Sequence, residues 1–108
     1  MDEKKIISLI GIAKKAGKVI SGTEMTVESV RSAKKSSVKL IVCSGDASAN
    51  TVKRINNPSG FYGIPVIRLT VVKTELARTV GHPSELSVIG ITDTGFAEAM
   101  LKAYENKN

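Results

Sequence analysis

Apolar residues recur along the chain with two periods, one typical of helices and one typical of buried strands. Apolar positions three or four residues apart predict five helices. We expect them from residue 6 to a stop at Gly17, from 23 to 35, from 46 or 48 to 55, from 73 to 80, and from 92 or 93 to 104. The segment Asn56–Gly60, with Pro58 inside it, is expected to be a turn or a frayed helix end.

Short apolar runs between these helices predict four strands. The run from Val38 to Ser44 is almost continuously apolar, which is typical of a central strand covered on both faces. Other strands are expected at 19–20, at 64–69 with Pro65 at its start, and at 86–91. Strands that alternate with helices indicate an α/β fold, so we predict a three-layer α/β/α sandwich forming one domain over residues 1–108.

The same spacing predicts which side chains face the core. In the second helix Val27, Val30 and Ala33 should be buried, which turns Met25, Glu28 and Ser32 outward. The last helix should bury Phe96, Met100 and Ala103. The single cysteine, Cys43, lies in an apolar run and is expected to be a small buried hydrophobic residue.

The charge balance favours a polyanionic partner. The 108 residues carry 16 Lys and Arg against 10 Asp and Glu, for a net charge of +6. A basic surface without such a partner would account for the same numbers. Aromatic residues make up only 4%, which disfavours base stacking and favours the shape of a folded RNA over a flexible strand.

Catalytic and metal-dependent functions find little support in the sequence. The segment Gly11–Lys18 resembles a phosphate-binding P-loop, but it ends a helix, and Val19 replaces the Ser or Thr that would hold magnesium. Asp46 follows a buried strand without the further carboxylates that a phospho-acceptor needs, so helix capping is the favoured role. His82 is the only histidine. We therefore expect no enzyme, cofactor or metal. Without a signal peptide or a membrane span, we expect a cytoplasmic protein, most simply a monomer.

The strongest candidate site is the start of the second helix. A short strand runs through Ser21 and Gly22 into Thr23, where free backbone N–H groups can receive phosphates or polar base edges. An outward Met25 is either a chance exposure or an apolar contact for a base or ribose. Glu24 either complements the helix dipole or accepts hydrogen bonds from a guanine edge.

Several stretches, in order and spacing, resemble the ribosomal-protein family typified by L7Ae and L30e, which binds kink-turn RNA. The chain is most similar to the small YlxQ-type members of Gram-positive bacteria. The resemblance runs from Ile6 to about Leu101. The matching stretches are LIGIAKKAGKV (9–19), SGT (21–23), VCSGDAS (42–48), YGIPV (62–66), EL (75–76) with Gly81, and VIGITDTGF (88–96).

The resemblance implies an L30e-like sandwich with a mixed four-stranded sheet and a ribosome-associated, kink-turn-binding function. It assigns the RNA surface to the helix start with its outer face, to the loop after the central strand, and to the turn after the fourth helix. Lysines along the chain would add attraction for phosphates. With these lysines included, the expected RNA-binding residues are Lys14, Lys15, Lys18, Ser21, Gly22, Thr23, Glu24, Met25, Glu28, Lys34, Ser44, Gly45, Asp46, Ala47, Gly81, His82, Pro83 and Ser84.

The chain departs from the family pattern on the outer face of the second helix. Glu24, Met25 and Glu28 stand where kink-turn binders usually carry polar or basic residues. Two uncompensated carboxylates there would repel backbone phosphates. This departure keeps a second hypothesis open, a protein–protein adaptor that uses Met25 and the acidic outer face of the same helix.

Overall fold

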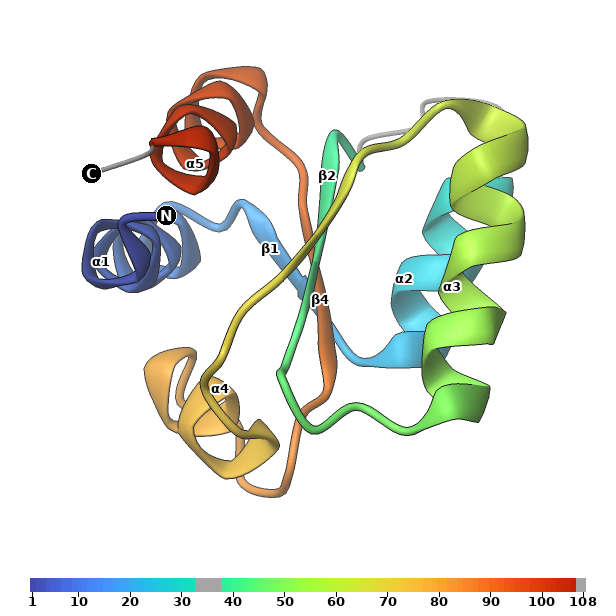
Figure 1. The fold of residues 1–108 in the computed structure, drawn as a ribbon, viewed down its shortest axis with the longest axis horizontal. Coiled ribbons are helices and arrows are strands. Elements are labelled where there is room, and N and C mark those ends of the chain that lie inside the picture. The colour runs from blue at the N-terminus through green and yellow to red at the C-terminus, as the bar shows by residue number, and fades with distance from the viewer. Residues whose placement is uncertain (33–37, 107–108) are drawn as a thin grey trace.

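A four-stranded sheet lies between two layers of helices in the computed structural model, which describes residues 1–32 and 38–106 (Figure 1). In the described residues the helices are α1 (Glu3–Lys15), α2 (Thr23–Arg31), α3 (Ala49–Tyr62), α4 (Lys73–Thr79) and α5 (Thr94–Glu105). The strands are β1 (Val19–Ser21), β2 (Leu40–Cys43), β3 (Val66–Arg68) and β4 (Val88–Ile91). The predicted α/β/α sandwich is therefore confirmed.

The sheet is mixed and has the strand order β1-β4-β2-β3. Strand β2 runs parallel to β3, whereas β4 pairs antiparallel with both β1 and β2. The residues of β2 and β4 are all buried, as the apolar runs predict for strands covered on both faces.

The two helical layers differ in size. Helices α1, α4 and α5 cover one face of the sheet and α2 and α3 cover the other (Figure 1). The first layer packs on a cluster of sixteen buried residues that includes Ile6, Ile10 and Met100. The second layer packs on seven, which are Val27, Val30, Val38, Ile41, Cys43, Ile55 and Val88.

Helix α3 corrects one prediction. It continues through Asn56–Gly60 to Tyr62 instead of turning there, and Pro58 lies inside it with its ring buried. Burial of the ring against the core offsets the backbone hydrogen bond that proline cannot make. The helix ends at Gly63, which adopts a left-handed conformation with φ of 69°.

The structure also decides three smaller predictions, on the N-caps of α3 and α5 and on the burial of Phe96. Ser48, not Asp46, caps α3, with its Oγ accepting from the N–H of Thr51 at 3.2 Å. Asp93, not Thr92, caps α5. Phe96 is only half-buried, because the fully buried position on that turn belongs to Ala97.

Most of the predicted core is confirmed. Val27, Val30, Met100, Ala103 and Cys43 are each at most 5% exposed. Helix α2 ends at Arg31, with Ser32 as its C-cap in an extended conformation, so the prediction that this helix continues to residue 35 is wrong. Ala33, Lys34 and Lys35 themselves lie outside the described residues. Across the part of the chain that the structure describes, none of the helices combines the length and the apolar character that spanning a bilayer requires.

Candidate nucleic-acid interface

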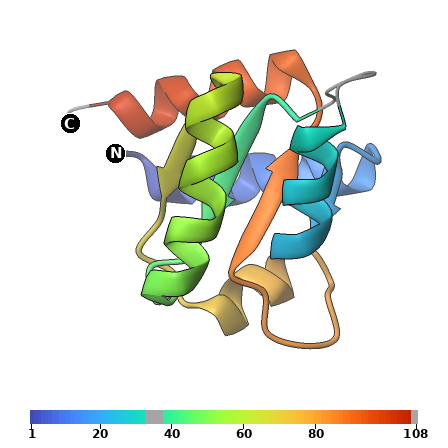
Figure 2. The same ribbon diagram turned by 90° about the vertical axis from the view of Figure 1, so that its right-hand side faces the viewer.

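Three segments that are far apart in the sequence meet at one end of the sheet. The N–H of Gly22 donates to the carbonyl of Val88 at 2.9 Å, and the N–H of Ser44 donates to the carbonyl of Ser87 at 2.8 Å. These bonds bring the start of α2, the loop after β2 and the segment before β4 to the lower end of the molecule in Figure 2. We call residues 21–25, 44–47 and 81–85 the loop edge.

Helix α2 begins at the loop edge without a side-chain cap. Its N-cap residue is Gly22, which has a φ of 104° and no side chain to accept hydrogen bonds from the first turn. By contrast, side chains at the N-caps of α1, α3 and α5 accept such bonds. Backbone donors and the positive end of the helix dipole at Thr23 and the residues after it are therefore available to an outside ligand.

The outer face of α2 is exposed as the spacing predicts. The side chain of Met25 is 60% exposed, and those of Glu24, Glu28 and Ser32 are also at the surface. Ser21 and Thr23 are half-buried, and Ser21 pairs with Ile89 in the sheet. The apolar Met25 thus stands free in the first turn of the helix that opens the loop edge.

Arg54 of α3 neutralises one of the two glutamates on α2. Its Nε donates to Oε2 of Glu24 at 2.6 Å, and its Nη2 donates to the other carboxylate oxygen. The hydrogen bond from Arg54 lowers the pKa of Glu24 from its ordinary value, desolvation opposes the shift, and the charges of Arg54 and Arg31 add to it. The expectation of an uncompensated carboxylate is therefore wrong for Glu24. Glu28 has no ion pair with any residue of 1–32 or 38–106.

The loop after β2 is held from two sides. Nη2 of Arg68 donates to the carbonyls of Gly45 and Ala47, each at 3.1 Å. On the other side, the carboxylate of Asp46 accepts from the N–H of Lys73 at 2.8 Å, at the start of α4. The side chains of Ser44 and Ala47 are buried, so among the predicted residues of this loop only Gly45 and Asp46 reach the surface.

Gly45 is required by a close approach of two backbone segments. A Cβ at this position would lie 2.8 Å from the carbonyl oxygens of Leu69 and Thr70. A larger residue would therefore have to move backbone atoms. This close approach fixes the place of the loop at the loop edge.

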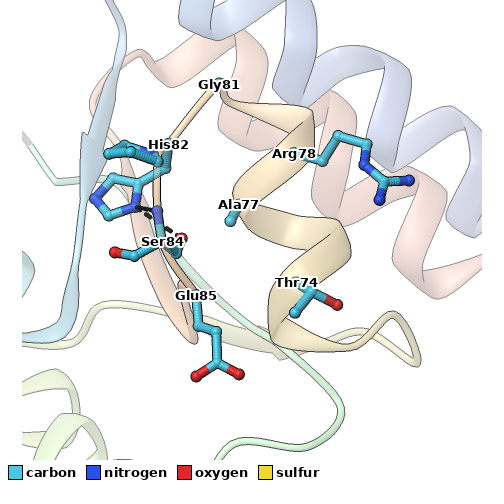
Figure 3. Close-up of a pocket in the computed structure, with 8 residues that line it drawn as sticks. Thr74, Ala77, Arg78, Gly81, His82, Ser84 and Glu85 are labelled. Carbon is cyan, nitrogen blue, oxygen red and sulfur yellow. Dashed lines mark hydrogen bonds between the residues drawn. The ribbon is translucent and has the colours of Figure 1, made fainter.

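The third segment turns sharply after α4. Gly81 has a φ of 68°, and Nδ1 of His82 lies 3.3 Å from the N–H and 2.9 Å from the carbonyl of Ser84 in the same turn. A hollow of about 570 Å³ lies between this turn and α4. Figure 3 shows the residues around it, with Arg78 extending from α4 on the side away from the His82 ring. Pro83, Ser84 and the neighbouring Glu85 are exposed.

The predicted lysines do not surround the start of α2. The carbonyl of Lys18 accepts from the N–H of Thr92, whereas Gly22 bonds to Val88 at the opposite end of the same strand pair. Strand β1 separates Lys18 from Gly22, so Lys18 lies at the end of the sheet opposite to the loop edge. Lys14 and Lys15, at the end of α1, lie with Lys18. Lys34 lies outside the described residues.

Other cations lie at or beside the loop edge, and the sequence reasoning missed them. They are Arg54, Arg68, Lys73 and Arg78. Arg68 was within reach of sequence reasoning, because it ends a strand parallel to β2, and parallel strands end at the same edge of a sheet. Nothing in the sequence pattern signals the position of Arg54, which contacts a residue thirty positions away.

The described residues offer no evident metal or thiol chemistry. Within residues 1–32 and 38–106, no three His, Cys, Asp or Glu side chains gather closely enough to hold a metal ion. Burial raises the pKa of the Cys43 thiol to about 11, with the charge of Arg68 opposing the shift. The thiol is therefore protonated and inert at neutral pH.

The layers and the mixed four-stranded sheet define a small α/β/α domain of the L30e-like class. The chain belongs to the ribosomal protein L7Ae/L30e/S12e/Gadd45 family, which it matches over residues 4–101. This membership confirms the family resemblance and the L30e-like architecture expected from the sequence.

Two relatives carry the same name. The chain is 36% identical over 104 residues to the RNA-binding protein YlxQ of Enterococcus faecium, covering 96% of this chain and 95% of that protein. It is 31% identical over 93 residues to the RNA-binding protein YlxQ of Bacillus subtilis, covering 86% and 88%.

Solved structures agree with this placement. A Bacillus halodurans protein of unknown function has a TM-score of 0.83 and 31% identity, over 94% of this chain and 98% of that chain. A 15.5kD RNA binding protein of Giardia lamblia has a TM-score of 0.77 over 94% and 83%, and at 14% identity it bears on the fold alone.

Proposed function

We propose that this protein is a ribosome-associated RNA-binding protein that recognises structured, kink-turn-like RNA through the loop edge. The observation that carries the proposal is the uncapped start of α2, flanked by two segments that hydrogen bonds hold in place, the loop after β2 and the turn after α4. Free backbone donors at a helix start suit phosphates and polar base edges. Both YlxQ relatives are named as RNA-binding proteins.

Recognition on this edge depends on shape more than on stacking. Of the aromatic side chains, Phe61 and Tyr62 lie at the end of α3 away from the loop edge. The ligand therefore meets backbone donors, the apolar Met25 and the cations beside the edge. Such a surface fits a preformed bend, in which base edges and phosphates already have fixed positions. This arrangement favours a binding protein over an enzyme.

The direct test is titration with a kink-turn duplex and with a plain duplex of equal length, each at two salt concentrations. We expect the kink-turn duplex to bind more tightly because its shape fits the loop edge. The preference should persist at both salt concentrations, because salt weakens phosphate contacts in both complexes. Equal and weak binding of the two duplexes would reduce the protein to a general basic binder. Co-sedimentation with ribosomal particles tests the ribosome association separately.

A protein–protein adaptor remains the second candidate, favoured by the exposed Met25 and by Glu28. The substitution Glu28→Lys separates the two functions. If the outer face of α2 meets RNA, replacing the carboxylate with an ammonium group strengthens RNA binding. If the face meets a basic partner protein, the same change weakens that complex.

A further inference from the structure

A groove that borders the loop edge at Ala47 lies along the side of α3 that faces β3. It has a volume of about 560 Å³. Its lining residues are Ala47, Ala49, Val52, Lys53, Asn56, Asn57 and Arg68, and we call it the α3–β3 groove. Arg54 points from α3 toward α2 instead, since it bonds to Glu24. Helix α3 thus separates the groove from the start of α2.

The charges of the groove favour an anion. It is lined by two cations and no carboxylate, whereas three other surface hollows include Glu85, Glu98 or Glu105 in their walls. Neither Lys53 nor Arg68 forms an ion pair with a residue of the described ranges 1–32 and 38–106. Both positive charges are therefore available to a ligand.

Arg68 is held ready for such a ligand. The two hydrogen bonds from Nη2 to the carbonyls of Gly45 and Ala47 fix the plane of the guanidinium. The N–H groups on Nε and Nη1 make no hydrogen bond to the described residues. A guanidinium that is already oriented loses less entropy when it binds a phosphate.

The remaining walls match the other parts of a nucleotide. Asn56 and Asn57 carry side-chain amides, which both donate and accept, as the edges of bases do. Val52, Ala47 and Ala49 supply an apolar surface for a ribose or the face of a base. Ala47 also belongs to the loop edge, so the groove begins where the loop after β2 ends.

We propose that the α3–β3 groove binds one nucleotide, with its phosphate at Lys53 and Arg68 and its base edge at Asn56 and Asn57. A single strand that leaves the structured RNA at the loop edge and passes Ala47 would place one of its nucleotides in the groove. If the nucleotide belongs to such a strand, the inference rests on the proposed function. A free mononucleotide offers the same chemistry. The following experiments distinguish the two sources.

The first experiment uses a kink-turn duplex with and without a short single-stranded extension. We expect the extension to tighten binding by the wild-type protein roughly three- to tenfold, and Lys53→Gln to abolish this gain. The salt slope for the extended RNA should fall by about 0.7 in the variant, the share of one phosphate contact on a single strand. Lys102→Gln on the exposed face of α5 removes the same charge elsewhere and should change neither result.

Two results of this experiment would overturn delivery by RNA. One is equal affinity of the wild-type protein for the extended and blunt duplexes. The other is an equal loss by Lys53→Gln on both duplexes, which would indicate general charge attraction. Asn57→Ala provides a second variant, because it keeps both cations and should still reduce the gain from the extension.

The second experiment does not require RNA binding at the loop edge. Uridine and adenosine 5′-monophosphate are titrated into the ¹⁵N-labelled full chain, and the backbone and Asn side-chain amide signals are followed by NMR. Shifts confined to residues 47–57 and 68 would establish the groove as a nucleotide site even if no kink-turn RNA binds. The same shifts with inorganic phosphate alone, or no shifts together with no effect of the extension, would refute the nucleotide site.

Discussion

Arg54 on α3 holds the carboxylate of Glu24, in the first turn of α2, with two hydrogen bonds. The pair lies at the surface, with 44% of the arginine side chain and 71% of the glutamate side chain exposed. In the proposed complex, the same guanidinium would be a partner for an RNA phosphate. The carboxylate of Glu24 thus occupies Arg54 and cancels a positive charge that would otherwise lie beside the helix start.

Glu24→Gln should therefore strengthen RNA binding. The amide removes the negative charge and releases Arg54 for a phosphate, so we expect a several-fold gain in affinity for the kink-turn duplex. The salt slope should become steeper by about 0.9, which corresponds to one additional phosphate contact on a duplex. Binding isotherms at a series of salt concentrations measure both quantities.

Two further variants show whether Arg54 carries this effect. Arg54→Gln alone should weaken binding, and the double variant Glu24→Gln with Arg54→Gln should lose the steeper slope. Glu98→Gln, on exposed α5, removes a carboxylate far from the loop edge and is the matched control. A double variant that binds as tightly as Glu24→Gln would show that the released arginine plays no part.

Gly22→Ala should destabilise the fold by about 1–3 kcal/mol, because an L residue is strained at a φ of 104° and a ψ of 149°. An added Cβ would meet no atom within 4 Å, so the cost comes from the backbone and not from crowding. Gly60→Ala is the matched control, since Gly60 lies inside α3 with equal space around it. That change should stabilise the protein by about 0.5–1 kcal/mol in urea unfolding. Equal effects of the two substitutions would contradict the strained helix start.

Gly45→Ala tests the packing of the loop after β2. The new Cβ would lie 2.8 Å from two carbonyl oxygens of the segment after β3, and backbone atoms cannot move aside as a flexible side chain can. We expect a loss of about 1–3 kcal/mol in the free energy of unfolding, with weaker RNA binding because the loop is displaced. Wild-type stability in this variant would mean that the approach is looser than described.

The Cys43 thiol should make stability depend on pH in the alkaline range. Its pKa in the folded protein is raised to about 11 from an ordinary value of 9.0, so between these values the folded state holds a proton that the unfolded state has lost. The free energy of unfolding therefore falls as pH rises through this window, by about 2–3 kcal/mol in total from this group. Urea unfolding of Cys43→Ala from below pH 9 to about pH 11 should show a smaller fall than the wild type. Parallel curves for the two proteins would contradict the raised pKa.

The sequence was sufficient for the layers of the fold, since apolar spacing alone located the central strands and the inward faces of α2 and α5. The sequence-based prediction of a turn at Pro58 was wrong. It assumed that nothing offsets the missing backbone N–H of proline, whereas the ring is buried inside α3, and that burial depends on tertiary packing. The first candidate segment of the site, at Gly22, followed from local chemistry. The other loop-edge segments entered through the family resemblance.

The charges around the site were harder to predict than its backbone. Proximity along the chain suggested that Lys18 flanks Gly22, but the extended strand β1 lies between them, so the two residues are at opposite ends of the β1–β4 strand pair. The pair of Glu24 and Arg54 depends on how α2 packs beside α3, which periodicity does not specify. Side-chain partners between elements therefore had to come from the structure.

The unequal helical layers have a consequence for motion. Helix α2 packs on the cluster of seven buried residues, whereas α1 and α5 share the cluster of sixteen. A segment with fewer apolar contacts opens locally at a lower free energy than the whole molecule unfolds. Amide hydrogens of α2 should therefore exchange with deuterated solvent sooner than those of α5, and a bound ligand should slow the exchange of α2 most of all.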